Sequence, residues 1–495
     1  MKQTEYISSA KLWFCKGLSG VLFFLAVFAL LFIAGAVSCS GPGNPNGPNP
    51  DNPDDPDNPG NHGQQLEGIA VTTQPTKSEY EVGEALNTAG MVVTANYSDG
   101  TKAPVTDYTL SVFDSSTPGI KSITVTYNEK TAGFDVTVLV PWNGPLSRNA
   151  TRLLNYLTDM YGEKMISGQA DTAWSSNSQN DMIARVFADT GKYPALKGFD
   201  FINIGREQAN EAIEWWDGKN RMNGGSATQL IPGRPDIHGI VTFCWHWRTG
   251  ANNDFYANNS SFRIPMSGGQ LDKTSAAFAT IKSDLDKVAA LLLLLKNRDI
   301  PVLWRPLHEA GGDATSVNGQ GWFWWGAGQT NDTTRAAACV ALWEYMYDYF
   351  TNEKGLNNLI WVWNGQRTTW FPNRDTVHII SYDVYTHNSS SVPADITNNQ
   401  HPIFQTRFES TRNTPPNKDL MVALTENGVM PDPVWSKQNN ILWSWFMTWN
   451  DGTAANESFW TGESHNTQAN KTYIYNHDLV ITLDELPDLT KYRLE

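Results

Sequence analysis

The sequence predicts a parallel (β/α)8 barrel preceded by a small all-β sandwich. Over roughly the last 350 residues, apolar strand-like runs alternate with helical stretches, which is typical of a parallel βα array. Eight such runs can be placed, and eight strands close a barrel. Before them, between residues 66 and 141, lie shorter alternating runs rich in Val, Thr and Tyr, which are separated by Gly, Asp-Gly and Pro turn signals.

The barrel prediction covers residues 143–495, and its strands end on polar or aromatic side chains. The predicted strands lie at 164–169, 195–202, 239–247, 301–309, 358–365, 377–385, 420–428 and 442–449. The clearest helices are predicted at 274–296 and 333–350. In order, the strands end in Gln169, Asp200, His246, Glu309, Asn364, Asp383, Glu426 and Trp449. A buried strand has no structural need to finish on such groups, and barrel chemistry lies at the C-terminal strand ends, so this mouth is the predicted site.

Residues 66–141 predict an antiparallel sandwich with a tight hairpin at YSDGT. The stretch resembles the bacterial immunoglobulin-like domains found in surface proteins, although the resemblance includes no functional residue. A spacer is the expected role, and carbohydrate binding is the alternative.

The N-terminus predicts export. Basic residues precede an apolar run, Val21–Val37, so residues 1–38 are interpreted as a signal peptide. Ala36–Cys39 resembles a bacterial lipobox, which implies that Cys39 is lipidated and becomes the mature N-terminus. An uncleaved transmembrane helix is the alternative. Residues 39–65 are rich in Pro, Asn and Asp and predict a semi-extended tether. We therefore expect a protein anchored by lipid to a bacterial membrane, at the cell surface or in the periplasm.

Composition limits the function further. The net charge is −15 and no cluster of Lys and Arg is present, which disfavours nucleic acid as a partner. The 20 tryptophans suit stacking on sugar rings, although core packing explains any single one equally well. Cys244 and Cys339 are expected to be buried small side chains rather than a disulfide framework.

Two glutamates carry the chemical prediction. Glu309 ends the fourth strand and Glu426, in LTENG, ends the seventh. Opposed carboxyl groups across a mouth are what glycoside hydrolysis needs, and a retaining enzyme holds them about 5 to 5.5 Å apart. A lone glutamate at a strand end could equally form a salt bridge at the rim, but the pair is a stronger signal.

The motifs WRPLHE, WFWWG, FCWHW, SYDVY and LTENG resemble glycoside hydrolase family 26, chiefly β-mannanases. The likeness covers about residues 149–493. It implies a retaining (β/α)8 hydrolase with Glu309 as general acid/base and Glu426 as nucleophile. It also implies that His308 takes the place of an asparagine found in much of the clan and contacts sugar beside the scissile bond.

The resemblance assigns further roles, each with a plainer alternative. Tyr385 is expected to donate a hydrogen bond to the nucleophile and to favour its ionised form, or else to bond at the barrel rim. Asp383 is expected to bind substrate hydroxyls, or else to form a salt bridge with an arginine such as Arg305. A less polar setting and nearby negative charge should keep Glu309 protonated.

Three aromatic or imidazole side chains complete the predicted site. His246 should face the pocket, unless it is a satisfied core histidine. Trp322 resembles the family's aromatic residue beside the acid/base, and Trp449 stands where clan members often place a sugar-stacking platform. Trp322 follows Glu309 by 13 positions, more than is usual in the family, so an enlarged Gly-rich loop should flank the cleft. This loop leaves endo or exo action open.

No cofactor is expected. The histidines form no HxH or HExxH pair, the cysteines are not clustered, and GQGWFWWGAG lacks the lysine of a phosphate loop, so no metal site is predicted. The expected protein is a monomeric, retaining endo-β-1,4-mannanase acting on mannan, glucomannan or galactomannan. A β-1,3-xylanase or mixed-linkage β-glucanase is the alternative within the family. A non-catalytic glycan-binding lipoprotein is the alternative of another class, and a purely structural adhesin is disfavoured by the paired glutamates.

Overall fold

The computed structural model describes residues 65–171, 181–221, 225–249, 252–312, 321–385, 399–414, 419–451 and 458–494. The predicted signal peptide, Cys39 and the tether lie outside these residues, as does most of the Gly-rich loop, at 313–320. The chain forms two compact units that divide between Leu139 and Val140. Among the described residues, none of the helices combines the length and apolar character needed to span a bilayer.

The N-terminal unit is a β-sandwich, as predicted. Its sheets have the strand orders β1-β3-β4 and β2-β7-β6-β5. The strands are β1 (Leu66–Thr73), β2 (Glu79–Tyr80), β3 (Val92–Tyr97), β4 (Lys102–Val105), β5 (Thr109–Leu110), β6 (Gly119–Tyr127) and β7 (Lys130–Val138). The sandwich is not wholly antiparallel, because β2 pairs with β7 in parallel. YSDGT forms the predicted β3–β4 hairpin, in which Gly100 has φ +81° and Tyr97 N donates to Thr101 O at 3.0 Å.

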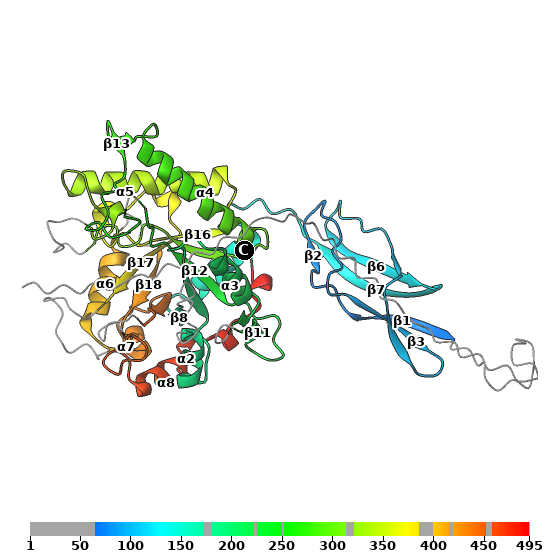
Figure 1. Ribbon diagram of the computed structural model, residues 1–495. Helices are drawn as coiled ribbons and strands as arrows, with labels where there is room; N and C mark the ends of the chain where they lie inside the picture. The colour runs from blue at the N-terminus through cyan, green and yellow to red at the C-terminus, as the bar shows by residue number, and fades with distance from the viewer. Residues whose placement is uncertain are drawn as a thin grey trace, which may run out of the picture. The chain divides into compact units, whose positions relative to one another are not determined.

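The C-terminal unit is a closed barrel of eight parallel strands, which confirms the predicted fold class (Figure 1). Around the ring the order is β8-β9-β12-β15-β16-β17-β18-β19, and β19 pairs with β8 to close it. The strands are β8 (Met165–Ala170), β9 (Leu196–Asp200), β12 (Ile240–Cys244), β15 (Val302–Arg305), β16 (Leu359–Trp363), β17 (Ile379–Val384), β18 (Met421–Asn427) and β19 (Trp445–Thr448). A short strand, β20 (Val480–Ile481), adds a second partner to β8.

Several predicted strands extend too far at the barrel mouth. The fourth was predicted to end at Glu309, yet β15 ends at Arg305. Pro306 has no N–H to donate to a ladder, and Leu307 and Glu309 both have φ +50°, a left-handed conformation that no strand contains. His246, Glu309, Asn364 and Trp449 therefore lie on the turns just beyond their strands.

Helices surround the barrel. They are α1 (Arg148–Met160), α2 (Met182–Thr190), α3 (Arg206–Trp216), α4 (Ala276–Lys296), α5 (Asp332–Tyr347), α6 (Pro402–Arg412), α7 (Pro433–Gln438) and α8 (Gln468–Tyr475). The predicted helix at 274–296 begins after its N-cap, Ser275, whose side chain accepts from Phe278 N. The helix predicted at 333–350 is α5, which continues into a short π-helix, Asp348–Glu353. Between β16 and β17 the connection contains only two 3-10 turns, Thr368–Trp370 and Arg374–Thr376.

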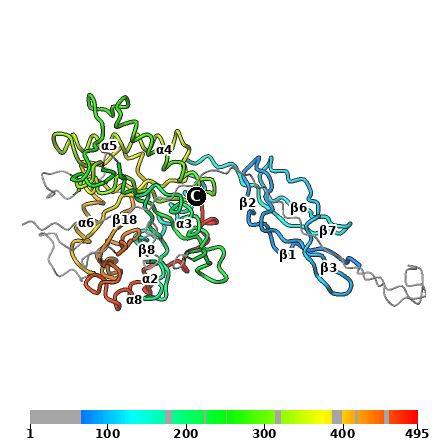
Figure 2. Tube along the Cα trace, in the orientation of Figure 1, coloured from blue at the N-terminus to red at the C-terminus, as the bar shows by residue number. Residues whose placement is uncertain are grey.

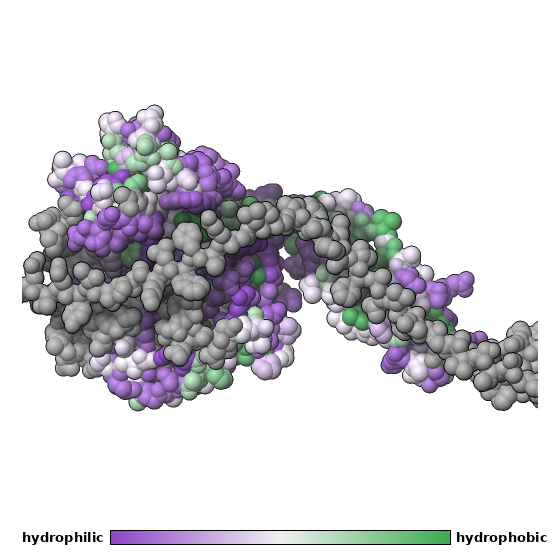
Figure 3. Space-filling model, viewed as in Figure 1, coloured by the Kyte–Doolittle hydropathy of each residue, from purple (hydrophilic) through white to green (hydrophobic). Residues whose placement is uncertain are grey.

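The end of the chain returns to its first helices. Helix α8 lies against α2 (Figure 2), where Asn476 Nδ2 donates to Thr190 O at 3.1 Å. Trp460 Nε1 donates to Asp189 Oδ2 at 2.9 Å in the same region. The described residues that are visible on the outer surface are mostly hydrophilic (Figure 3). Beneath this surface, buried apolar residues of the strands and the helices form one core cluster in the barrel unit.

Most tryptophans belong to the core. Of the 20 tryptophans, 18 lie among the described residues, and twelve of these have less than 2% of their surface exposed, among them Trp304 in β15 and Trp361 in β16. The high tryptophan content thus mainly reports the packing between strands and helices rather than sugar stacking. Cys244 and Cys339 are both buried and free, as expected.

One ion pair is sealed between the barrel wall and the outer helices. Lys197, in β9, is 1% exposed, and its Nζ lies 2.8 Å from both Asp171 Oδ2 and Asn220 Oδ1. Because an unpartnered buried charge is costly, this lysine and its acceptors depend on each other.

We predict that Lys197→Met lowers the free energy of unfolding of the barrel unit by about 3 to 5 kcal/mol, because Asp171 loses its buried partner. The matched control is Lys437→Ala, which breaks an exposed pair with Glu163 and should cost about 1 kcal/mol or less. Denaturant unfolding followed by tryptophan fluorescence measures both. Equal effects of the two substitutions would contradict the prediction.

Candidate active site

Three carboxyl groups meet at the barrel mouth. They belong to Glu309, on the turn after β15, Asp383 in β17 and Glu426 in β18. One carboxylate oxygen of each lies within 4.8 Å of the others, and the three residues are only 8%, 5% and 4% exposed. The predicted pair of glutamates is therefore brought together, with a third acid beside it.

Arg305 bridges two of these acids. It is the last residue of β15 and is 1% exposed. Its Nη1 donates to Asp383 Oδ2 at 2.9 Å, and its Nη2 donates to Glu426 Oε1. Asp383 has no exposed side-chain surface on which to bind a substrate hydroxyl. The structure therefore favours the alternative, a salt bridge to Arg305, over the expected contact with substrate.

Glu426 is held on both sides as a carboxylate. One of its oxygens accepts from Arg305, and the other accepts from Tyr385 Oη at 2.7 Å. Each oxygen of Glu426 thus accepts a hydrogen bond from a different side chain. Tyr385 therefore makes the hydrogen bond to Glu426 that was expected of it.

Glu309 stands on a strained turn that Asn364 secures. Glu309 has φ +50°, and its N–H donates both to Asn364 Oδ1 at 3.0 Å and to Asn364 O at 2.7 Å. The amide nitrogen of Asn364 reaches Asp383 Oδ1 at 3.0 Å and Thr425 Oγ1 at 2.8 Å. Asn364 has no exposed surface, so it links the turn that carries Glu309 to the two strands that carry the other acids.

The environment keeps a proton on Glu309. Burial raises its pKa well above the ordinary value, and the negative charges of Asp383 and Glu426 raise it further. Arg305 and a hydrogen bond from Trp322 act in the opposite direction and are outweighed. Burial also raises the pKa of Asp383, to about 7. The proton belongs on Glu309, because Asp383 accepts from Arg305, Asn364 and Thr425 as a carboxylate.

The WFWWG motif braces this mouth through three indole N–H groups. Trp322 Nε1 donates to Glu309 Oε2 at 2.8 Å, Trp324 Nε1 to Trp247 O at 2.7 Å, and Trp325 Nε1 to His308 O at 2.9 Å. A Cβ at Gly326 would overlap the carbonyl oxygen of Ala310. The motif thus supports the backbone on both sides of Glu309.

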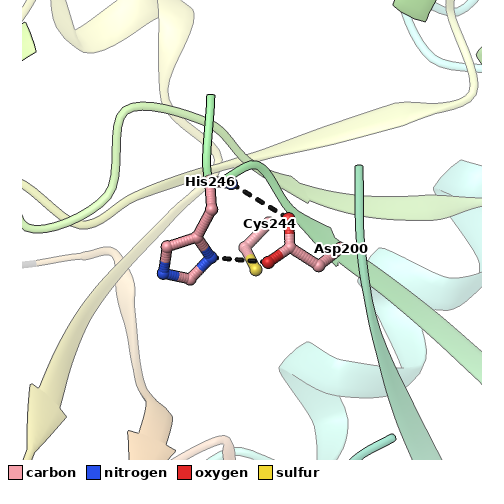
Figure 4. Close-up of side chains that lie close together, drawn as sticks. All are labelled: Asp200, Cys244 and His246. Atoms are coloured by element: carbon pink, nitrogen blue, oxygen red, sulfur yellow. Dashed lines mark hydrogen bonds and ion pairs between the residues drawn. The ribbon is translucent and has the colours of Figure 1, made fainter. Parts of the chain in front are cut away.

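Two histidines lie beside the acids. His308 Nε2 and His246 Nε2 are 3.3 Å apart, and His246 Nδ1 lies 2.5 Å from Asp200 Oδ2 (Figure 4). His246 has 14% of its side chain exposed, whereas His308 is only 1% exposed. His246 therefore has some surface to offer to the mouth, and a sugar contact by His308 stays a prediction.

Trp449 is partly buried and lies 5.8 Å from His246, ring centre to ring centre. The backbone N–H of Trp449 donates to Asn427 O at 3.0 Å, which fixes this residue just beyond β19. The ring is thus beside the site, and its use as a stacking platform stays a prediction.

Comparison with known proteins identifies the family of the barrel unit. A family model described as glycosyl hydrolase family 26 matches residues 143–485. The chain belongs to glycosyl hydrolase family 26. A second model, bacterial Ig-like domain (group 3), matches residues 73–138 in the N-terminal unit.

Relatives of this family 26 chain include several mannanases. Mannan endo-1,4-beta-mannosidase of Thermothelomyces thermophilus is 29% identical over 354 residues, which cover 70% of this chain and 62% of that protein. Mannan endo-1,4-beta-mannosidase A of Piromyces sp is 29% identical over 350 residues, covering 68% of this chain and 49% of that protein. The chain therefore spans about half to three fifths of the length of these relatives.

Among solved structures, the barrel resembles a β-mannanase from a symbiotic protist of the termite Reticulitermes speratus. That structure is complexed with gluco-manno-oligosaccharide. The TM-score is 0.53 at 26% identity, and the match covers 70% of this chain and 97% of the other.

Potential metal ligands gather in two places among the described residues. One is the acid cluster, Glu309, Asp383 and Glu426, and the other is Asp200, Cys244 and His246. In the first, Arg305 and Tyr385 already engage the carboxylates. In the second, Asp200 and His246 bond to each other. Hydrogen bonds and ion pairs thus account for both arrangements.

Sequence analysis did not identify Arg305, Asn364 or Asp200 as part of the site. Arg305 was considered only as a partner for Asp383, although an arginine inside an otherwise apolar strand is itself a signal of a buried ion pair. Asn364 and Asp200 were noted only as strand ends. Their partners lie far away along the chain, so no local pattern connects them.

Proposed function

We propose that this family 26 protein is a retaining glycoside hydrolase that cleaves β-1,4-mannosidic linkages by double displacement. One observation carries the proposal: carboxylate oxygens of Glu309 and Glu426 lie within 4.8 Å of each other. This spacing fits the short separation of a retaining pair and is below the roughly 6.5 to 9.5 Å that separates the acids of an inverting enzyme.

In the first step, ionised Glu426 attacks the anomeric carbon while Glu309 gives its proton to the glycosidic oxygen. The bond to the leaving sugar breaks, and a covalent glycosyl-enzyme forms on Glu426. Arg305 and Tyr385 orient the nucleophile, and Trp322 orients the proton donor.

In the second step, water attacks the glycosyl-enzyme, and Glu309, now a carboxylate, removes a proton from it. Formation of the ester removes the negative charge of Glu426, which is one of the charges that raise the pKa of Glu309. The change therefore lowers the pKa of Glu309, so that this residue holds its proton less strongly when it must act as a base. Hydrolysis of the ester restores the starting state.

The substrate class rests on the relatives. Two proteins named mannan endo-1,4-beta-mannosidase match most of the barrel unit, and a structure complexed with gluco-manno-oligosaccharide shares its fold. We propose mannan, glucomannan or galactomannan as the substrate, with His246, His308, Trp322 and Trp449 as sugar contacts.

We also propose export with a lipid anchor at Cys39 and a spacer role for the Ig-like domain.

A substrate panel tests the function. We expect release of reducing ends from linear mannan but not from lichenan or β-1,3-xylan. A spread of oligomers from the start would mean endo action, and mannobiose alone would mean exo action.

Glu426→Ala should lower turnover at least about a thousandfold while binding to mannan survives, because the nucleophile is lost and the cleft is not. Release from β-1,3-xylan or lichenan instead of mannan, or wild-type turnover by Glu426→Ala, would contradict the proposal.

The pH profile tests the role of Asp383. A general acid must be protonated, so kcat/KM falls as the pH rises through the pKa of Glu309. Because the charge of Asp383 raises that pKa, Asp383→Asn should move the alkaline limb of kcat/KM to lower pH, by about one unit. Asp159→Asn, which removes a carboxylate paired with Arg493 outside the site, is the control and should leave the limb in place. A shift of the limb to higher pH in Asp383→Asn, or no shift, would contradict the assignment.

A further inference from the structure

Asp200 directs both of its oxygens at one residue. Its Oδ1 accepts from the backbone N–H of His246 at 2.9 Å, and its Oδ2 lies 2.5 Å from His246 Nδ1 (Figure 4). Asp200 is 2% exposed at the end of β9, and His246 follows the neighbouring strand β12. A buried carboxylate on Nδ1 requires that this nitrogen carries a proton.

The other side of the His246 ring decides the state of His308. The Nε2 atoms of the two rings face each other at 3.3 Å. If His246 carries protons on both nitrogens, its Nε2 is a donor, and the facing Nε2 of His308 must accept. His308 is then neutral and 1% exposed, with its proton on Nδ1, a buried atom that has no hydrogen-bond partner among the described residues.

Charges around the pair agree with this state. Burial lowers the pKa of His246, but the charge and hydrogen bond of Asp200 outweigh burial, and the net effect is a raised pKa. Glu426 acts in the same direction as Asp200, and Arg305 acts against both. Burial, followed by the charges of His246 and Arg305, lowers the pKa of His308 well below its ordinary value.

We propose that Asp200 is a positioning residue that places the single positive charge of the histidine pair on His246 and keeps His308 neutral. The proposal deepens the proposed function and rests on it. It assigns to Asp200 a role in the reaction that acts entirely through the two rings.

The location of this charge matters because His308 directly precedes the proton donor. A cationic His308 would favour the ionised form of Glu309 and work against proton donation. A cation on His246 instead faces Asp200, and the charge of Glu426 acts in the same direction as that of Asp200 on the pKa of His246. Asp200 therefore holds the positive charge on His246 and keeps it off His308, the residue that precedes Glu309.

The surroundings of His246 retain the arrangement. Phe255 and Phe323 pack edge-on against its ring, with ring centres 4.9 and 5.6 Å away. The thiol of Cys244 lies beside Asp200 and His246, and burial raises its pKa well above the ordinary value, so it adds no charge (Figure 4). Asp200 is thus the carboxylate in direct contact with His246.

Nitrogen-15 NMR of the full chain labelled at histidine tests the proposal, because imidazole 15N shifts report both charge and tautomer. Signals of the two residues are assigned with His246→Gln and His308→Gln. In the wild type at pH 7, we expect His246 to be protonated on both nitrogens and His308 to be neutral with its proton on Nδ1. Asp200→Asn should lower the titration midpoint of His246 by at least about one pH unit and reduce kcat tenfold or more, with KM changed less.

Asp284→Asn is the matched control. Asp284 is also a buried carboxylate, in α4, where it accepts from Trp247 Nε1 at 3.0 Å and pairs with Lys287, but it bonds to neither imidazole. It should leave the titration of His246 unchanged.

A neutral His246 in the wild type at pH 7, a proton on His308 Nε2, or an unchanged midpoint in Asp200→Asn would overturn the proposal. If Asp200→Asn does not fold, the wild-type spectrum decides by itself. Failure of the proposed function is distinguishable, since a wild type without hydrolase activity would fail the substrate panel whatever its histidine spectrum shows.

Discussion

One buried arginine faces three buried carboxyl groups at the barrel mouth, and this imbalance of charge organises the site. Arg305 forms ion pairs with Asp383 and Glu426, and in the part of the chain that the structure describes Glu309 forms no ion pair with a cationic side chain. Three negative charges within 4.8 Å, shielded from water, would be far more costly than two, so the third group keeps its proton. The same arrangement thus distinguishes two identical side chains, because Glu426 is paired with Arg305 and Glu309 keeps the proton that its proposed role requires.

The backbone around Glu309 is built to hold that acid in place. Its left-handed conformation is unfavourable for a residue with a Cβ and persists only where neighbours fix it. Asn364 binds the N–H of Glu309 from one side, and the indole of Trp322 binds its carboxyl group from the other. The close approach of Gly326 to Ala310 completes the support. Strain at the turn is therefore balanced by contacts from β16 and from the WFWWG motif.

Much of this could be predicted from sequence because it is local. Eight apolar runs gave the barrel, and Glu309 and Glu426 stood out because each ends such a run. The local pattern could not show how deeply each side chain is buried. Asp383 was expected to reach substrate, yet its partner Arg305, 78 residues away, holds it inside the wall. Tryptophan content suggested sugar stacking, and most of those rings are core. Strand ends were also placed too far along, since left-handed turns such as that at Leu307 leave no mark in hydrophobic periodicity.

In the proposed mechanism, Glu426 forms a covalent bond to the sugar, while Glu309 donates a proton in the first step and removes one from water in the second. Mass spectrometry of Glu309→Ala mixed with 2,4-dinitrophenyl β-mannobioside tests it most directly. This leaving group needs no proton, so the first step should proceed, while the second should stall without its base. We expect a mannobiosyl adduct to accumulate and to map to the peptide that contains Glu426. No adduct, or an adduct on any other residue, would contradict the covalent role of Glu426.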